Sequence, residues 1–206
     1  MAAGISLSII IGYMLGGINP AFILSKIKRV DMLQSGTGNL GTTNAFIHFG
    51  KGWGLFVLAF DMGKAITAVK LCEWWFPGMM LTGIAAGCFA VIGHMFPVYT
   101  NFRGGKGVAS FGGFILAMNW KYFLILLVIG CVLAFVFNYG CSISFSAAVL
   151  FPIIMTFQMR LVGVFVLLTA CSGCIIYKHM DNIGKIREGK EVPIRVFLKK
   201  YIFKRG

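Results

Sequence analysis

The chain has 206 residues, of which 58% are hydrophobic and 12% are charged, and its formal net charge is +13. Its mean hydropathy of +0.86 indicates more apolar surface than a soluble domain of this length can bury, so composition predicts an all-α polytopic membrane protein. The positive charge is not interleaved with aromatic residues in a basic module. This pattern argues against nucleic acid as a partner and favours anionic membrane lipid and phosphorylated substrates.

Seven apolar segments are predicted to cross the membrane as helices. In chain order they cover residues 3–24, 53–72, 79–97, 105–118, 121–138, 142–157 and 161–178. The fourth and sixth segments are shorter than the roughly 20 residues that a perpendicular transmembrane helix needs. We therefore expect these two helices to pack inside the bundle or to open into a polar cavity, where unpaired backbone groups are tolerated.

Most of the 19 Lys and Arg residues lie in three stretches, from Lys26 to Lys51, from Arg103 to Lys106 and from Lys178 to Arg205. Seven crossings put all three stretches on the same side of the membrane. By the positive-inside rule that side is cytoplasmic, so the N-terminus is predicted outside and the C-terminus in the cytoplasm. The first segment is followed by basic residues and preceded by none, which is typical of a retained helix and not of a cleaved signal peptide.

Residues 35–44, with the sequence SGTGNLGTTN, form a glycine loop rich in hydroxyl and amide groups. Short polar side chains and accessible backbone N–H groups suit a phosphate without adding charge. A second interpretation is that these residues only cap the start of a helix. The spacing of Gly36, Gly38 and Gly41 also matches a dinucleotide-binding fingerprint. That motif requires a preceding strand, whereas this loop follows a membrane helix, which argues against a Rossmann fold.

Residues 103–108, with the sequence RGGKGV, form a second and positively charged glycine loop. Three glycines permit a tight turn that brings backbone N–H groups toward one oxyanion, and Arg103 and Lys106 add positive charge. The apolar run that begins at Val108 supplies a helix N-terminus, which also favours an anion. The sequence therefore predicts a phosphate site here. The alternative is a basic turn that faces lipid headgroups.

A third polar stretch runs from Tyr177 to Lys185, at the end of the last apolar segment. His179 is a candidate proton acceptor in this stretch, although a histidine at such a position is also compatible with an ordinary surface residue. Asp61 and Lys64 lie one helical turn apart in the second segment, where they mark either an ion path of a small transporter or a mutual ion pair.

Other chemistries find no support in the sequence. The six cysteines are scattered, and Cys171-x-x-Cys174 lies in an apolar segment without a second ligand pair, so no zinc site or disulfide framework is expected. The sequence contains neither a G-x-S-x-G nucleophile elbow nor a His followed four or five residues later by Asp. No metal and no other cofactor is predicted.

The three polar stretches together resemble the motifs of the acyl-phosphate-dependent glycerol-3-phosphate 1-acyltransferase (PlsY) family of bacterial inner membranes. These motifs are S-G-x-G-N-x-G-x-T-N, G-H-x-x-P-V-x-x-x-F-[KR]-G-G-K-G-V-A and H-x-x-N-x-x-[KR] followed by G-x-E, and the resemblance extends to about Glu191. It implies a seven-helix enzyme whose active site faces the cytoplasm. The implied reaction moves a fatty acyl group from acyl phosphate to the 1-hydroxyl of glycerol 3-phosphate, giving lysophosphatidic acid and phosphate.

The resemblance also implies roles for individual residues. The residues implied in catalysis are His179, Asn182 and Ser35. The residues implied in substrate binding are Gly38, Asn39, Thr43, Asn44, Arg103, Gly104, Gly105, Lys106, Gly107 and Ser144. Glu191 is implied to be structural. The implied partners are acyl phosphate, glycerol 3-phosphate and membrane lipid, and the protein is expected to act as a monomer or in loose association with an enzyme that produces acyl phosphate.

The chain departs from the family pattern at several positions. Ile47, followed by His48, stands where the family usually has an Arg, and Cys141 stands where a serine is common. We expect residues 1–191 to form a single membrane domain and residues 192–206 to form a basic amphipathic tail on the inner leaflet. A weakly active or regulatory paralogue is therefore an open alternative, and a small membrane transporter is a further one.

Overall fold

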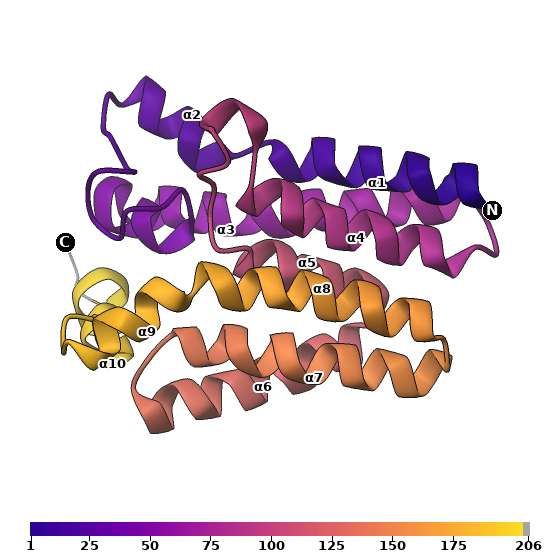
Figure 1. Ribbon diagram of the computed structural model, residues 1–206. Helices are drawn as coiled ribbons and strands as arrows, with labels where there is room; N and C mark the ends of the chain where they lie inside the picture. Colours follow the sequence, from indigo (N-terminus) through magenta and orange to yellow (C-terminus); the bar gives the residue numbers. More distant parts are fainter. Residues whose placement is uncertain (204–206) are drawn as a thin grey trace. The chain divides into compact units, whose positions relative to one another are not determined.

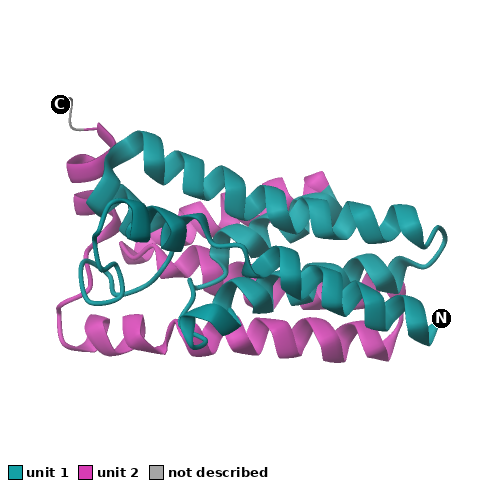
Figure 2. Ribbon diagram, turned by 90° about the horizontal axis from the view of Figure 1, so that it is seen from above, with its two compact units in different colours: residues 1–119 teal, residues 120–206 magenta. Residues whose placement is uncertain are grey.

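The structure is a computed structural model that describes residues 1–203, and over these residues every regular element is a helix (Figure 1). The all-α prediction is confirmed for this part of the chain. The chain forms two compact units, residues 1–119 and residues 120–206, which Figure 2 draws in teal and magenta. Each unit is described by itself below.

Unit 1 contains five α-helices and a short 3₁₀-helix. They are α1 (Ala2–Gly17), α2 (Pro20–Ile27), α3 (Thr42–Trp75), α4 (Met80–Met95), η1 (Val98–Thr100) and α5 (Val108–Met118). Helices α1 and α4 run in the same direction and pack closely through small residues: a Cβ on Gly12 would overlap Ala86, and one on Gly16 would overlap Ala90. Helix α3, which lies between α2 and α4 in the chain, runs in the opposite direction. The segments that link the helices at residues 28–41 and 96–107 therefore gather at the end of unit 1 away from the N-terminus (Figure 1).

The first predicted span is broken, which corrects the expectation of one continuous helix over residues 3–24. Helix α1 ends at Gly17 and α2 begins at Pro20, while Ile18 and Asn19 adopt extended backbone conformations. Proline has no N–H group and disfavours a helical conformation of the residue before it, so a helix ends at this point. The Asn19 Oδ1 atom accepts a hydrogen bond from the Phe22 N–H (2.9 Å) and thereby caps α2.

Helix α3 contains the second predicted span and extends it at the N-terminal side as far as Thr42. Its axis is interrupted at Gly50, whose φ of 80° and ψ of −175° are not helical. Helix α5 has only 11 residues and buries Phe111, Phe114 and Ile115 against α3 and α4. The prediction that the short fourth segment packs inside its bundle is thus confirmed within unit 1.

Unit 2 begins with three long helices in sequence. They are α6 (Trp120–Phe137), α7 (Cys141–Met159) and α8 (Val162–Lys178), and the smaller elements α9 (Met180–Arg187), α10 (Ile194–Phe197) and the π-helical turn η2 (Leu198–Phe203) follow them. Helix α7 packs against both α6 and α8. The expectation that the sixth segment is short was wrong, because α7 has 19 residues. Hydropathy falls at Gln158, but the backbone stays helical until Arg160 turns left-handed with φ 51°.

Five helical stretches in the described residues are long and apolar enough to cross a membrane. They are Ala2–Ile27, Met80–Thr100, Trp120–Phe137, Cys141–Met159 and Val162–Arg187. The assignment as a multi-pass membrane protein follows from these stretches. The count of seven crossings stays a prediction, as does the division into a domain of residues 1–191 and a tail. Lys204 and Arg205 of that tail lie outside the described residues.

Candidate active site

The first glycine loop is wrapped around one side chain, Asn44, which is buried in the first turn of α3. The Asn44 Nδ2 group donates to the carbonyl oxygens of Met32 (2.8 Å), Asn39 (2.9 Å) and Ser35 (3.2 Å). Its Oδ1 atom accepts the Thr37 N–H at 2.9 Å. Because the amide is fully engaged with the loop backbone, Asn44 shapes the loop instead of offering its own donors to a ligand.

The other predicted residues of this loop lie around that centre. Gly38 is exposed and has a φ of +73°, a left-handed conformation that favours glycine. The Asn39 Nδ2 group donates to Thr37 Oγ1 at 3.0 Å, and Thr43 is exposed at the start of α3. Gly38 and Thr43 are therefore the two of these predicted residues that are open to solvent.

Ser35 contacts a residue that the sequence did not single out as a site residue, His48. The Ser35 hydroxyl donates to the Asp31 carbonyl oxygen (2.5 Å), and its Oγ lies 3.2 Å from His48 Nε2. A hydroxyl has a single proton, so with that proton on Asp31 the His48 Nε2–H must be the donor to Ser35. Ser35 is thus not arranged as a nucleophile activated by His48. The sequence could have indicated His48 as a neighbour of this loop, because it lies one helical turn after Asn44 on the same face of the helix.

The second glycine loop uses its first two glycines to approach the end of α4. The Gly104 N–H donates to the Met95 carbonyl (3.1 Å), and the Gly105 N–H donates to the His94 carbonyl (3.2 Å). These two N–H groups, which the sequence offered to an oxyanion, are therefore engaged by α4. A Cβ on Gly104 would overlap the His94 carbonyl oxygen, and one on Gly105 would overlap His94 Nε2. Both positions thus require glycine for close contact.

The remaining residues of this loop carry the charge and the helix start. Lys106 is half-buried, whereas Arg103 is exposed. Gly107, with φ +82°, precedes the first turn of α5. Lys106 and the positive end of the α5 dipole are thus adjacent in the chain, which is an arrangement suited to an anion.

The two glycine loops are neighbours in unit 1. A Cβ on Gly105 would lie 2.9 Å from the Leu40 carbonyl oxygen, and the Cβ position of Gly41 lies 4.0 Å from Gly105 Cα. The Leu40 carbonyl in turn accepts a hydrogen bond from Asn19 Nδ2 at 3.0 Å. Two segments that are both predicted to bind phosphate are thus brought together, although Leu40 and Gly105 are 65 positions apart in the sequence.

The third motif lies in unit 2. His179 is buried between α8 and α9, and its Nδ1 atom lies 2.8 Å from the Ile175 carbonyl oxygen. Since a carbonyl can only accept, Nδ1 carries the proton of the neutral ring and Nε2 carries the lone pair that a general base needs. The His179 ring lies 5.6 Å from the ring of Phe145, the neighbour of the buried Ser144.

Asn182 is positioned by its neighbours in the same unit. Its backbone N–H donates to the His179 carbonyl (3.0 Å), and its Nδ2 group donates to Glu191 Oε1 (2.6 Å). Glu191 therefore contacts a predicted catalytic residue, in agreement with the structural function expected for it. The predicted site residues thus divide between the units: the two glycine loops belong to unit 1, and Ser144, His179 and Asn182 belong to unit 2.

A family model with the description "Glycerol-3-phosphate acyltransferase" matches residues 6–189 of the chain. The chain belongs to the glycerol-3-phosphate acyltransferase family. A relative of that name from Mesorhizobium japonicum is 34% identical over 195 residues, covering 94% of this chain and 98% of the relative. Another, from Prochlorococcus marinus, is 33% identical over 191 residues, covering 91% of this chain and 96% of the relative.

Two solved structures of one family member have the same fold as this chain. Both are crystal structures of PlsY (YgiH), an integral membrane glycerol 3-phosphate acyltransferase. The glycerol 3-phosphate form matches with a TM-score of 0.85 and 26% identity, covering 97% of this chain and 99% of that one. The lysophosphatidic acid form matches with a TM-score of 0.80 and 27% identity, covering 95% and 99%. The resemblance drawn from the three motifs is thereby confirmed.

The structure of this chain also confirms the predicted pairing of Asp61 and Lys64. Lys64 Nζ lies 2.7 Å from Asp61 Oδ1, and both side chains are buried. An ion path therefore finds no support in the paired geometry, and family membership further weakens the transporter alternative. Across residues 1–203 no group of three or more His, Cys, Asp or Glu side chains is placed to hold a metal ion.

Proposed function

We propose that the chain transfers a fatty acyl group from acyl phosphate to the 1-hydroxyl of glycerol 3-phosphate, giving lysophosphatidic acid and inorganic phosphate. Membership of the glycerol-3-phosphate acyltransferase family and the names of its relatives support the acyltransferase activity. The choice of donor rests on the residues. Residues 1–203 contain compact glycine loops suited to phosphate and no strand that could form the strand-based pocket of a nucleotide headgroup.

The observation that carries the proposal is the proximity of the two glycine loops at Gly105 and Leu40. Both substrates carry a phosphate group, so the site must hold two anions close together. Lys106 and the N-terminus of α5 supply positive charge on one side of this junction. On the other side, the loop of residues 35–44 offers the exposed hydroxyl of Thr43 as a neutral donor. One loop alone would not suit both anions.

The chemistry needs no covalent enzyme intermediate. The 1-hydroxyl oxygen of glycerol 3-phosphate attacks the acyl carbon of acyl phosphate, the bond from that carbon to the phosphate oxygen breaks, and phosphate leaves with the electron pair. The hydroxyl proton passes to a base. Because phosphate is a good leaving group, positioning and deprotonation of the hydroxyl can suffice. This agrees with a Ser35 whose proton is already donated to Asp31.

We assign the base to His179 or to a phosphate oxygen of a substrate. The orientation of His179, with Nδ1 bonded to the Ile175 carbonyl, favours the first of these. Asn182 holds the backbone of this turn, while Ser144 and the exposed residues Gly38 and Thr43 are proposed to contact substrate. Lys106 and Arg103 are proposed to bind phosphate, with Asn39 and Asn44 shaping the first loop.

We further propose seven crossings of a bacterial inner membrane, with the N-terminus outside and the glycine loops facing the cytoplasm. The clustering of residues 28–41 and 96–107 at one end of unit 1 supports this orientation. Cysteine labelling from the cytoplasmic side near Lys51, and from the outer side near Glu73 and Arg160, tests it. Cytoplasmic labelling near Glu73 would contradict the orientation.

A side-by-side assay of two acyl donors tests the proposed activity. Purified protein in detergent is given glycerol 3-phosphate with long-chain acyl phosphate, or with the matching acyl-coenzyme A at equal concentration. We expect lysophosphatidic acid only from acyl phosphate, because the bulky coenzyme head does not suit a site built for two phosphates. Comparable rates from acyl-coenzyme A would contradict the proposed donor.

A second candidate function is a weakly active or regulatory member of the family. The observation that favours it is Ile47, which stands where the family usually has an arginine. His48 Nε2 lies beside the first loop and supports retention of a donor at this place. Turnover far below that of a relative assayed in parallel, with acyl phosphate as the donor, would favour this second candidate.

A further inference from the structure

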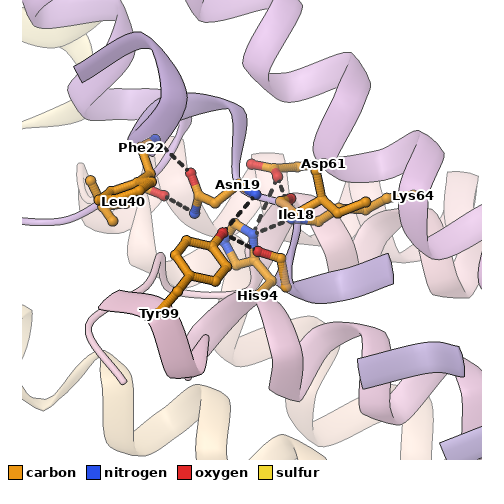
Figure 3. A network of polar contacts seen from close by, with 9 residues as sticks. Ile18, Asn19, Phe22, Leu40, Asp61, Lys64, His94 and Tyr99 are labelled. Atoms are coloured by element: carbon orange, nitrogen blue, oxygen red, sulfur yellow. Dashed lines mark hydrogen bonds and ion pairs between the residues drawn. The ribbon is translucent and has the colours of Figure 1, made fainter. Parts of the chain in front are cut away.

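Three buried ionisable residues form a cluster in the interior of unit 1, and the reaction proposed above uses none of them (Figure 3). They are Asp61 and Lys64 on α3 and His94 on α4, and they are 1%, 6% and 2% exposed. Lys64 Nζ lies 2.7 Å from Asp61 Oδ1 and 2.9 Å from His94 Nδ1. Ionisable side chains inside a membrane domain are costly, so their presence calls for a functional reason.

The Lys64 ammonium is at the centre of the cluster, where it forms an ion pair with Asp61 and a hydrogen bond to His94. It also donates to the Ile18 carbonyl oxygen at 2.8 Å. The Ile18 carbonyl is accessible because the helix breaks between α1 and α2. Lys64 therefore ties the helix break to both α3 and α4.

The bond from Lys64 determines the tautomer of His94. The His94 Nδ1 atom accepts from the ammonium, so the proton of the neutral imidazole is on Nε2. Asp61 Oδ1 lies 3.2 Å from the same Nδ1 and forms its ion pair with Lys64. The His94 Nε2–H side of the ring faces Gly105, where an added Cβ would overlap it.

A second set of hydrogen bonds links the break between α1 and α2 to the first glycine loop. Asn19 Nδ2 donates to the Leu40 carbonyl of the first loop at 3.0 Å. The Asn19 N–H donates to the Tyr99 hydroxyl at 3.1 Å, and that hydroxyl donates to the Gly17 carbonyl. Figure 3 shows these side chains and the Asp61–Lys64–His94 cluster directed toward one another from four segments of unit 1.

Fold stability alone is a poor explanation for such a cluster. Removing two charges from water costs about as much as their attraction returns, and apolar replacements of buried ion pairs are often neutral or stabilising. What the cluster does provide is geometry: it fixes one imidazole edge directly against Gly105. Gly105 is the residue at which the two glycine loops meet, next to Lys106.

We propose that Asp61, Lys64 and His94 are positioning residues that hold the Gly105 segment against Leu40, so that Lys106 is presented to the phosphate of glycerol 3-phosphate. The cluster acts through His94 and does not touch the reacting atoms. This inference rests on the proposed function for its substrate. If the cluster is broken, we expect the Kd for glycerol 3-phosphate to rise while the protein still folds and the KM for acyl phosphate changes little.

The test compares neutral variants of the cluster with a matched control. Lys64→Met removes the central donor, and the double variant Asp61→Asn/Lys64→Met avoids an unpaired buried carboxylate if the single variant does not fold. Lys70→Met is the control. Lys70 also forms an ion pair on α3 with an acidic residue three positions away, Glu73 (Nζ to Oε2, 2.8 Å), but the Lys70 side chain is exposed. Binding of glycerol 3-phosphate is measured by calorimetry, and both KM values are measured by lysophosphatidic acid formation.

We expect the Kd and KM for glycerol 3-phosphate to rise about ten- to hundredfold in the cluster variants, since a shift of about 1 Å has effects of this size. The KM for acyl phosphate should stay within about twofold, as should every constant of Lys70→Met. His94→Gln, which keeps an N–H donor near the position of Nε2, should bind glycerol 3-phosphate more tightly than His94→Leu.

Two results would overturn the inference. One is an unchanged Kd for glycerol 3-phosphate in the folded cluster variants. This result counts against the inference even if the variants give a lower yield of folded protein. The other is equal binding by His94→Gln and His94→Leu. Failure of the proposed function is a separate result: wild-type protein that binds glycerol 3-phosphate without turnover refutes the reaction, while the Kd comparison still decides the inference. Wild-type protein that does not bind glycerol 3-phosphate refutes both.

Discussion

Gly105→Ala is the substitution with the most direct structural consequence for the junction of the two loops. The added Cβ would overlap His94 Nε2 and would lie 2.9 Å from the Leu40 carbonyl oxygen. Neither neighbour can move freely, because the imidazole is bonded to Lys64 and the carbonyl to Asn19. The two loops must therefore separate by about 1 Å to restore ordinary contact distances, and overpacking of this kind costs about 1–3 kcal/mol of stability.

The expected kinetic effect follows from that displacement. A misplacement of about 1 Å reduces kcat/KM about 100-fold, equivalent to about 2.7 kcal/mol of transition-state stabilisation. The assay is lysophosphatidic acid formation by purified protein at varied glycerol 3-phosphate. Gly173→Ala is the matched control, since Gly173 is exposed on α8 and has nothing within 4 Å of its Cβ position. Kinetic constants of Gly105→Ala within about twofold of wild type would mean that close contact at Gly105 is not needed for activity.

Three further substitutions test separate parts of the site. Lys106→Ala should raise the KM for glycerol 3-phosphate about ten- to hundredfold through loss of a charge-assisted contact, and an unchanged KM would mean that the second loop is only a turn. Asn44→Ala leaves the carbonyls of the first loop without their donor, so thermal unfolding in detergent should reveal a loss of about 2–4 kcal/mol; an unchanged Tm would contradict the function given to Asn44. Ile47→Arg should lower the KM for a phosphate substrate if His48 replaces a guanidinium only in part, whereas a higher KM would show a pocket built around Ile47.

Much of the fold could be predicted because long segments of high hydropathy indicate membrane helices. The predicted spans 79–97, 121–138 and 161–178 correspond to α4, α6 and α8 within a few residues. The break at Ile18 and Asn19 was missed, although Pro20 is a local signal for it, because apolar residues on both sides keep the hydropathy high. The length of α7 was missed for the opposite reason: polar residues lowered the hydropathy before the helix ended.

The site was less predictable than the fold. The Asp61–Lys64 pair follows from helical spacing, but its contact with His94 joins two helices and depends on how they pack. Similarly, the sequence indicates that Gly104 and Gly105 form a tight turn. It does not reveal that their N–H groups bond to the end of α4, because that requires the position of the Met95 carbonyl. The roles of His179, Asn182 and Ser144 stay predictions.

The proposed acyl transfer is tested by product stoichiometry in proteoliposomes. Purified protein is reconstituted and supplied with long-chain acyl phosphate and labelled glycerol 3-phosphate, and lysophosphatidic acid and inorganic phosphate are measured together. We expect equal amounts of 1-acyl lysophosphatidic acid and phosphate, with both products lost in parallel as glycerol 3-phosphate is withdrawn. Phosphate release without lysophosphatidic acid, or uptake of labelled glycerol 3-phosphate into the vesicles without acylation, would contradict it.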